Sequence, residues 1–164
     1  MVSTHSAIQY IVPGAAYIAD YLLDEDGGII RWRRPEPQPT PEEIEAARLP
    51  AARALRIEAV KTERDRRKFE GVYVGANRFH SDPDSRTQQI GLVLMGANLP
   101  AVNWKTMGGS FVTMTPTLAG QIFGATAQRD ITVFAAAEAH IAAIAALTDA
   151  EAVMAYDFST GWPE

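Results

Sequence analysis

An alternating proline segment, followed at once by a helix start, divides this chain. Proline stands at every second position of residues 35–39, and because it fixes φ and lacks an amide hydrogen, an extended polyproline II spacer is expected. Thr40, Pro41 and Glu43 then form a helix N-terminus with a capping box. The spacer therefore predicts a separate N-terminal region, residues 1–34.

A long helix is expected over residues 41–68. Pro50 is expected to kink or break it, because a proline ring inside a helix removes one hydrogen bond and clashes with the preceding turn. Leu55, Ala59 and Thr62 form only a thin apolar stripe along its second half. Such a helix packs on one side only, or joins copies of the chain in a homo-oligomer.

Three segments of the N-terminal region have the alternation or apolar runs of short strands: residues 8–12, 17–23 and 29–32. A turn signal, Asp26-Gly27-Gly28, precedes the last of them. The pattern predicts a small β-meander. A sheet of this size is marginal alone, so we expect it to need a partner.

The C-terminal part predicts two β-hairpins and three helices. The hairpins span residues 71–81 and 102–114, with Gly75-Ala76-Asn77 and Gly108-Gly109 as turns. The first helix begins at Asp82 and Pro83. The apolar face expected on it consists of Ile90, Val93, Leu94 and Ala97. A second helix begins at residues 115–116, and Asp130 is expected to cap a third.

The fold class is therefore predicted as α+β with segregated pieces. We expect an N-terminal β region at residues 1–34, a proline spacer with a kinked helix at residues 35–69, and a compact C-terminal domain at residues 70–164.

Composition argues against several kinds of function. The chain has no cysteine, so disulfides, thiol catalysis and thiolate metal sites are excluded. Its net charge of -5 argues against wholesale nucleic-acid binding. No signal peptide and no apolar run long enough for a bilayer are visible, which predicts synthesis in the cytoplasm and no membrane partner.

Catalytic and metal-binding patterns are equally sparse. His80, Asp82 and Asp84 could together hold a metal, but Asp82 stands where a helix cap belongs, and Asp84 lies in a first helical turn that favours acids. Capping is the stronger interpretation. No nucleophile motif and no phosphate-binding glycine pattern occurs. We expect no enzyme activity, no metal and no cofactor.

Two basic clusters, residues 31–34 and 64–68, leave nucleic-acid association as the alternative function. The second cluster also suits a helix C-terminus, where cations interact favourably with the dipole. Aromatic and arginine side chains anchor protein interfaces, and several stand in short polar segments. The candidate partner-binding residues are Arg31, Trp32 and Arg33, and in the tail Tyr156, Phe158 and Trp162.

Four long motifs suggest a family: RDRRKFEGV at 64–72, FHSD with DSR at 79–86, NWKTM with GSFVTMT at 103–115, and AYDFSTGWP at 155–163. Together they resemble a domain of unknown function common in tailed-phage genomes (DUF4376-like), over about residues 60–163. The layout of β part, proline spacer and C-terminal domain resembles that of phage tail-fibre assembly proteins.

This resemblance implies a protein that binds other proteins and implies no catalytic residue. The expected partner is a phage tail-fibre or receptor-binding protein. The expected role is that of a fibre assembly chaperone, or of an accessory structural component of the tail. The protein would act in the host cytoplasm during assembly and could stay in the virion.

Overall fold

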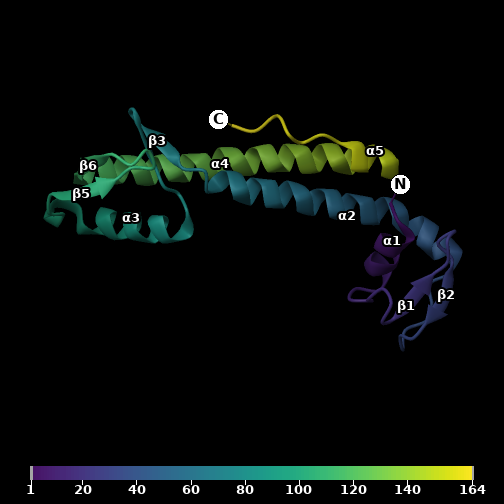
Figure 1. The fold of residues 1–164 in the computed structure, drawn as a ribbon. Coiled ribbons are helices and arrows are strands. Elements are labelled where there is room, and N and C mark those ends of the chain that lie inside the picture. Colours follow the sequence, from purple (N-terminus) through teal and green to yellow (C-terminus); the bar gives the residue numbers. More distant parts are fainter. Residues whose placement is uncertain (1, 164) are drawn as a thin grey trace. The chain divides into compact units, whose positions relative to one another are not determined.

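The computed structural model describes residues 2–163 and confirms the α+β fold class (Figure 1). Its sheets are three separate antiparallel pairs within that range, β1–β2, β3–β4 and β5–β6. The helices and strands are α1 (Thr4–Ile11), β1 (Tyr21–Leu23), β2 (Ile29–Trp32), α2 (Pro41–Lys68), β3 (Val72–Val74), β4 (Asn77–Phe79), α3 (Pro83–Met95), the 3₁₀ turn η1 (Gly96–Asn98), β5 (Val102–Lys105), β6 (Phe111–Met114), α4 (Pro116–Ala146) and α5 (Ala150–Ala155).

The chain divides into two compact units. Unit 1 comprises the residues up to Val60 together with His140–Thr160, and unit 2 comprises Lys61–Ala139 together with the residues from Gly161 onward. Each unit contains part of α2 and part of α4. None of the helices within residues 2–163 has the length and apolarity needed to cross a membrane.

The N-terminal region begins with a helix, and the strand predicted at residues 8–12 is wrong. Ser3 caps α1 by accepting the Ser6 amide hydrogen at 3.1 Å. Ala7 and Ile8 are buried, and Ile11 packs beside them, so the apolar positions follow a helical period. The apparent alternation of residues 8–12 is a fragment of that longer pattern.

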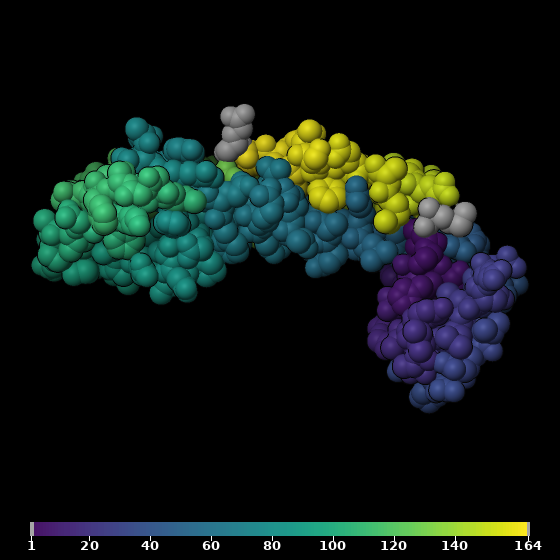
Figure 2. Space-filling view, in the orientation of Figure 1, coloured from purple at the N-terminus to yellow at the C-terminus, as the bar shows by residue number. Residues whose placement is uncertain are grey.

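A hairpin follows α1, with Tyr21 opposite Trp32 and Leu22 opposite Arg31. The register shifts after Leu22, which leaves Ile30 as an extra residue on β2. Figure 2 shows α1 and this hairpin as one closely packed body. Their core extends past the proline spacer, because Ile44 and Ala47 of α2 belong to the same buried cluster as the residues of α1 and the hairpin.

The capping box of α2 is confirmed. Thr40 donates its amide hydrogen to Glu43 at 2.8 Å, and its hydroxyl oxygen accepts the Glu43 amide hydrogen at 3.2 Å. Pro50, which was expected to kink or break this helix, does not break it, because α2 is continuous from Pro41 to Lys68. A proline removes one backbone hydrogen bond, and the burial of Ala51 and Ala52 beside it offsets that loss.

The apolar stripe predicted on α2 is also wrong. Leu55 is 47% exposed, and Thr62 is exposed as well. The buried positions of this helix are instead Ile44, Ala47, Ala51, Ala52 and Val60. The buried face therefore consists mainly of small residues, which hydropathy alone ranks below leucine.

Both C-terminal hairpins are confirmed. β3 pairs with β4, with Val74 opposite Asn77, and β5 pairs with β6, with Lys105 opposite Phe111. Asp82 caps α3 by accepting the Ser85 amide hydrogen at 3.0 Å, as predicted. The core of unit 2 contains the buried residues Val72, Phe79, Met114, Ala119 and Ile122.

The inward face of α3 differs from the predicted one. Gln89 is buried and donates its side-chain amide to the His80 carbonyl at 2.7 Å. Leu92 and Val93 pack on the core, whereas Ile90 is 45% and Leu94 81% exposed. The polar residue Gln89, whose hydrogen bond is satisfied, lies on the inward side of α3. The apolar pattern therefore predicted a buried face that is displaced by about one residue from the observed one.

The last helices also differ from expectation. α4 is one helix over Pro116–Ala146, so the predicted helix start at Asp130 is wrong. The Asp130 carboxylate binds Arg86 instead of capping. The short helix α5 was not expected, although Asp149 caps it by accepting the Ala152 amide hydrogen at 2.7 Å.

Candidate functional site

Trp32 ties the hairpin of unit 1 to the proline spacer. Its ring packs against the buried cluster, with its centroid 6.0 Å from that of Tyr21. The indole N–H donates to the Glu36 carbonyl at 2.7 Å. The polar edge of this candidate anchor is thus bonded within the chain, and the residue as a whole is half-buried.

The arginines around Trp32 differ in their contacts. The Arg31 guanidinium donates to the Ile18 carbonyl, and Arg34 pairs with Glu36 at 3.0 Å. Arg33 is exposed, and its backbone amide donates to the Asp20 carbonyl at 2.8 Å. Of the two arginines predicted to bind a partner, Arg33 is exposed and Arg31 is half-buried.

The tail residues Tyr156 and Phe158 are held by Arg56 of α2, all within unit 1. The Arg56 guanidinium donates to the Tyr156 carbonyl, and its carbon lies 4.6 Å from the centroid of the Phe158 ring. The Tyr156 hydroxyl lies 2.9 Å from Nδ1 of the largely buried His140. No local sequence pattern marks His140 as the partner of Tyr156, which lies 16 residues further along the chain.

Trp162 belongs to unit 2, where the Arg67 guanidinium carbon lies 5.2 Å from the centroid of its ring. The tail aromatics thus divide between the units, and arginines of α2 cover part of Phe158 and of Trp162. The structure does not bring the six predicted residues into one contiguous site within either unit.

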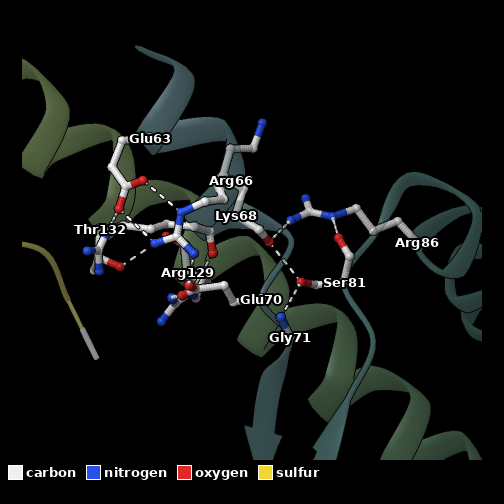
Figure 3. Close-up of polar contacts among 10 residues, drawn as sticks. Glu63, Arg66, Lys68, Glu70, Gly71, Ser81, Arg86, Arg129 and Thr132 are labelled. Atoms are coloured by element: carbon white, nitrogen blue, oxygen red, sulfur yellow. Dashed lines mark hydrogen bonds and ion pairs between the residues drawn. The ribbon is translucent and has the colours of Figure 1, made fainter. Parts of the chain in front are cut away.

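The second basic cluster forms a charged junction with acids of the same unit (Figure 3). Glu63 accepts from Arg66 at 2.7 Å and from Arg67 at 2.6 Å. Glu70 accepts from Arg66 at 2.6 Å and from Arg129 at 3.0 Å. These pairs neutralise much of the positive charge that a phosphate backbone would need.

The same junction caps the C-terminal end of α2. The Lys68 carbonyl accepts from the Ser81 hydroxyl at 2.8 Å and from Arg86 at 3.0 Å, and the Ser81 oxygen accepts the Gly71 amide hydrogen at 2.9 Å (Figure 3). Arg86 also pairs with Asp130 at 2.5 Å. Because the last carbonyls of a helix lack intrahelical partners, these side chains complete its end.

Of the candidate metal residues His80, Asp82 and Asp84, Asp82 caps α3, and Asp84 lies in its first turn. Asp82 accepts from the Ser85 amide at 3.0 Å and from its hydroxyl at 2.7 Å, and these bonds hold the pKa of Asp82 below its usual value. The His80 Nδ1 lies 3.8 Å from an Asp82 oxygen. Among residues 2–163, no three or more histidines and acids are grouped so that they could hold a metal ion.

Residues 51–160, more than half of the chain, match the family described as a domain of unknown function (DUF4376). The chain belongs to the DUF4376 family. Residues 4–57 match a second family, the XkdW protein, which is phage-associated. No curated protein and no solved structure matches the chain. The chain is therefore a phage-related protein carrying a domain of unknown function.

In this DUF4376 protein, the matched region contains the whole charged junction. Arg86 belongs to one of the motifs that suggested the family, but its contacts with Asp130 and with the end of α2 could not be read from the motif. Arg129 and Arg56 were missed altogether, since no local pattern marks them. The two family matches overlap at residues 51–57, inside α2.

Acid sensitivity is expected at the junction of the DUF4376 protein. The hydrogen bond from Arg66 is the largest cause that lowers the pKa of Glu63 from 4.5 to about 2. Burial opposes it, and the bond from Arg67 and the charges of both arginines lower the pKa further. A carboxylate whose native pKa is lowered stabilises the fold above its unfolded pKa, and the stabilisation is lost as pH falls through the native value. For Glu63 this loss occurs between pH 4.5 and about 2.

We expect Glu63→Gln to lower the free energy of unfolding by about 1 kcal/mol at neutral pH, because solvent screens a partly exposed pair. The difference from the unmodified protein should shrink as pH falls below 4.5, and urea unfolding across this range measures it. Glu45→Gln is the matched control, because Glu45 is 74% exposed in its pair with Arg48. A Glu63→Gln deficit independent of pH would contradict the assignment.

Proposed function

We propose that this DUF4376 protein is associated with the tail fibre of its phage and acts by binding other proteins. Its role would be that of a fibre assembly chaperone or of an accessory component of the tail. It would act in the host cytoplasm during assembly. Membership of phage-associated families supports the phage context. The layout of the sequence, which resembles that of tail-fibre assembly proteins, supports the fibre.

The observation that carries the proposal is the exposed apolar surface of a very small sheet. Near β1 and β2 the exposed fractions are 46% for Tyr17, 66% for Ile18 and 64% for Ile30. The sheet has two strands, which is marginal in water, and large exposed apolar side chains of this kind mark interaction sites. A bound fibre segment would cover these side chains.

The groups that could carry catalysis make structural bonds instead, which supports a binding role. Asp82 caps α3, Asp130 pairs with Arg86, and His140 contacts the Tyr156 hydroxyl. The alternative, nucleic-acid association, is disfavoured by the acidic partners of the second arginine cluster. We therefore propose a protein partner and no enzymatic activity.

The decisive experiment is co-expression with the fibre protein encoded beside this chain, followed by size-exclusion chromatography. A stable complex is expected. Ile30→Asp and Trp162→Ala test the two groups of exposed or half-exposed apolar side chains. Each should weaken binding by about 2 kcal/mol or more if its side chain is a central anchor, which is roughly a thirtyfold change in Kd.

Glu25→Ala, at an exposed acid in the loop of the same hairpin, is the matched control and should bind normally. The proposal fails if the two proteins never co-elute and the fibre folds and supports infection equally well without this chain. Normal binding by both anchor variants would instead place the contact on another surface.

A further inference from the structure

A groove of about 240 Å³ opens between α3 and α4 in unit 2. Its apolar walls are Ile90 of α3 with Phe123 and Ala127 of α4, and Ile90 and Phe123 are each 45% exposed. The ion pair between Arg86 and Asp130 forms part of its lining. A cavity of about 150 Å³ can hold a benzene molecule, so this groove has room for an apolar side chain.

A buried polar group inside the groove lacks a partner. Thr126 lines the groove and is 5% exposed, and its hydroxyl has no hydrogen-bond partner within the described residues. Leaving a buried donor or acceptor unpaired costs about 1–3 kcal/mol. A segment that fills the groove and also accepts a hydrogen bond from Thr126 would therefore bind more tightly than a purely apolar segment.

An apolar knob stands beside this hole. Leu94 lies one helical turn after Ile90 on α3, where side chains at i and i+4 are about 5–6 Å apart. Leu94 is 81% exposed, the largest exposed fraction among the large apolar side chains of the described chain. Its helical turn is the last of α3, where the carbonyl oxygens have no partner within the helix, although that of Val93 accepts the Gly96 amide hydrogen.

The outer face of α4 next to the groove is apolar as well. Gly120 and Gly124 lie there one turn apart, and an added Cβ would meet no atom within 4 Å at either. Ile131 is 64% exposed further along the same face. Exposed apolar side chains that lie together on one face mark interaction sites, so this face indicates an interface.

We propose that this face joins two copies of the chain in a symmetric dimer, in which Leu94 of each copy enters the α3–α4 groove of the other. A knob beside a hole is self-complementary, because a two-fold rotation about an axis between them places each knob in the opposite hole. The incoming last turn of α3 would also bring carbonyl oxygens towards Thr126. The lining adds no net charge, since Arg86 and Asp130 neutralise each other, so the chain's charge of -5 does not oppose contact here.

The size of the face sets the expected strength. From Gly120 to Ile131, α4 extends about 17 Å at 1.5 Å per residue, and α3 widens the face by roughly 10 Å. This is smaller than the roughly 800 Å² per partner of a standard interface, so a reversible dimer with a micromolar Kd is expected. The proposed dimer does not depend on the fibre. Its surface also differs from the helix of residues 41–68, which the sequence suggested for oligomerisation.

The test is sedimentation of the full chain over about 2–200 µM, a range that brackets a micromolar Kd. The mass should rise from one copy to two. Leu94→Asp should raise Kd at least tenfold, because a charge would enter an apolar groove, and Ala127→Arg should do the same by filling the groove. Tyr73→Asp is the control, because Tyr73 is 67% exposed on β3, outside the lining of this groove.

Circular dichroism and thermal unfolding of each variant, at a concentration where the unmodified protein is a monomer, check the fold. Leu94→Asp should keep the helical content because its side chain contacts solvent, with only a small loss of stability from an acid in the last turn of a helix. A monomer at every concentration overturns the proposal. So does a dimer that survives Leu94→Asp, or a mass that grows without limit. Because the fibre is absent from this experiment, its outcome and that of the co-expression experiment are independent.

Discussion

Replacing Arg86 with leucine is expected to lower the free energy of unfolding by about 2 kcal/mol, because it removes a partly exposed ion pair and two hydrogen bonds from a charged donor to backbone carbonyls. The side chain of Arg86 is 20% exposed and pairs with Asp130 at 2.5 Å and 2.9 Å. It also donates to the carbonyls of Lys68 and Ser81. Leucine would leave the Asp130 carboxylate and the end of α2 without these donors. Urea unfolding followed by circular dichroism measures the loss.

Arg66→Leu is the matched control. Arg66 also binds two acids, Glu63 and Glu70, but its side chain is 55% exposed. Each acid keeps a second arginine, Arg67 or Arg129, so the loss should stay below about 1 kcal/mol. Equal losses for Arg86→Leu and Arg66→Leu would show that Arg86 does not complete the end of α2.

The elements that could be predicted from the sequence are those with a local chemical signal. Gly108-Gly109 between two β-prone runs predicts the β5–β6 hairpin, and Asp82 before Pro83 predicts the start of α3. Thr40 and Glu43 likewise mark the start of α2. In each case the residues that determine the structure lie within a few positions of one another, so no tertiary information is needed.

The errors occur where a local pattern allows two interpretations. Residues 8–12 fit both an alternating strand and part of a helix, and the Ser3 cap that decides between them lies outside that window. On α3, the buried Gln89 depends on the distant His80 carbonyl, so its inward position could not be seen from hydropathy. Asp130 resembles a cap but pairs with Arg86, which precedes it by 44 residues.

The sequence could predict which kinds of residue are candidates for binding, but it could not predict the contacts that these residues make. Aromatic and arginine content marked Trp32 and the tail, whereas the cover that Arg56 and Arg67 give to the tail rings depends on the tertiary structure. The exposure of Leu94 is likewise a property of the packed unit, since the same residue was assigned to the core face by periodicity. Surfaces for partners are therefore located by the structure rather than by composition.

Gly71→Ala is expected to destabilise the fold by about 3 kcal/mol or more. Gly71 has φ +96°, a conformation that residues with a side chain adopt at a penalty of about 1–3 kcal/mol. An added Cβ would also lie 2.7 Å from the carbonyl oxygen of Phe79 and would overlap the sulfur of Met107. The Phe79 oxygen is a backbone atom of β4, and the Phe79 side chain is fully buried, so this oxygen cannot move aside easily.

Gly75→Ala is the control without the steric overlap. Gly75 also has a positive φ, +60°, but an added Cβ there would meet nothing within 4 Å. Gly75→Ala should lower the free energy of unfolding by about 1 kcal/mol, the cost of placing a residue with a side chain at positive φ. Urea unfolding of both variants measures the difference, which reports the steric overlap at Gly71 together with the larger backbone cost of φ +96°. If both alanines cost the same, the close approach of Gly71 to Phe79 and Met107 does not constrain this hairpin.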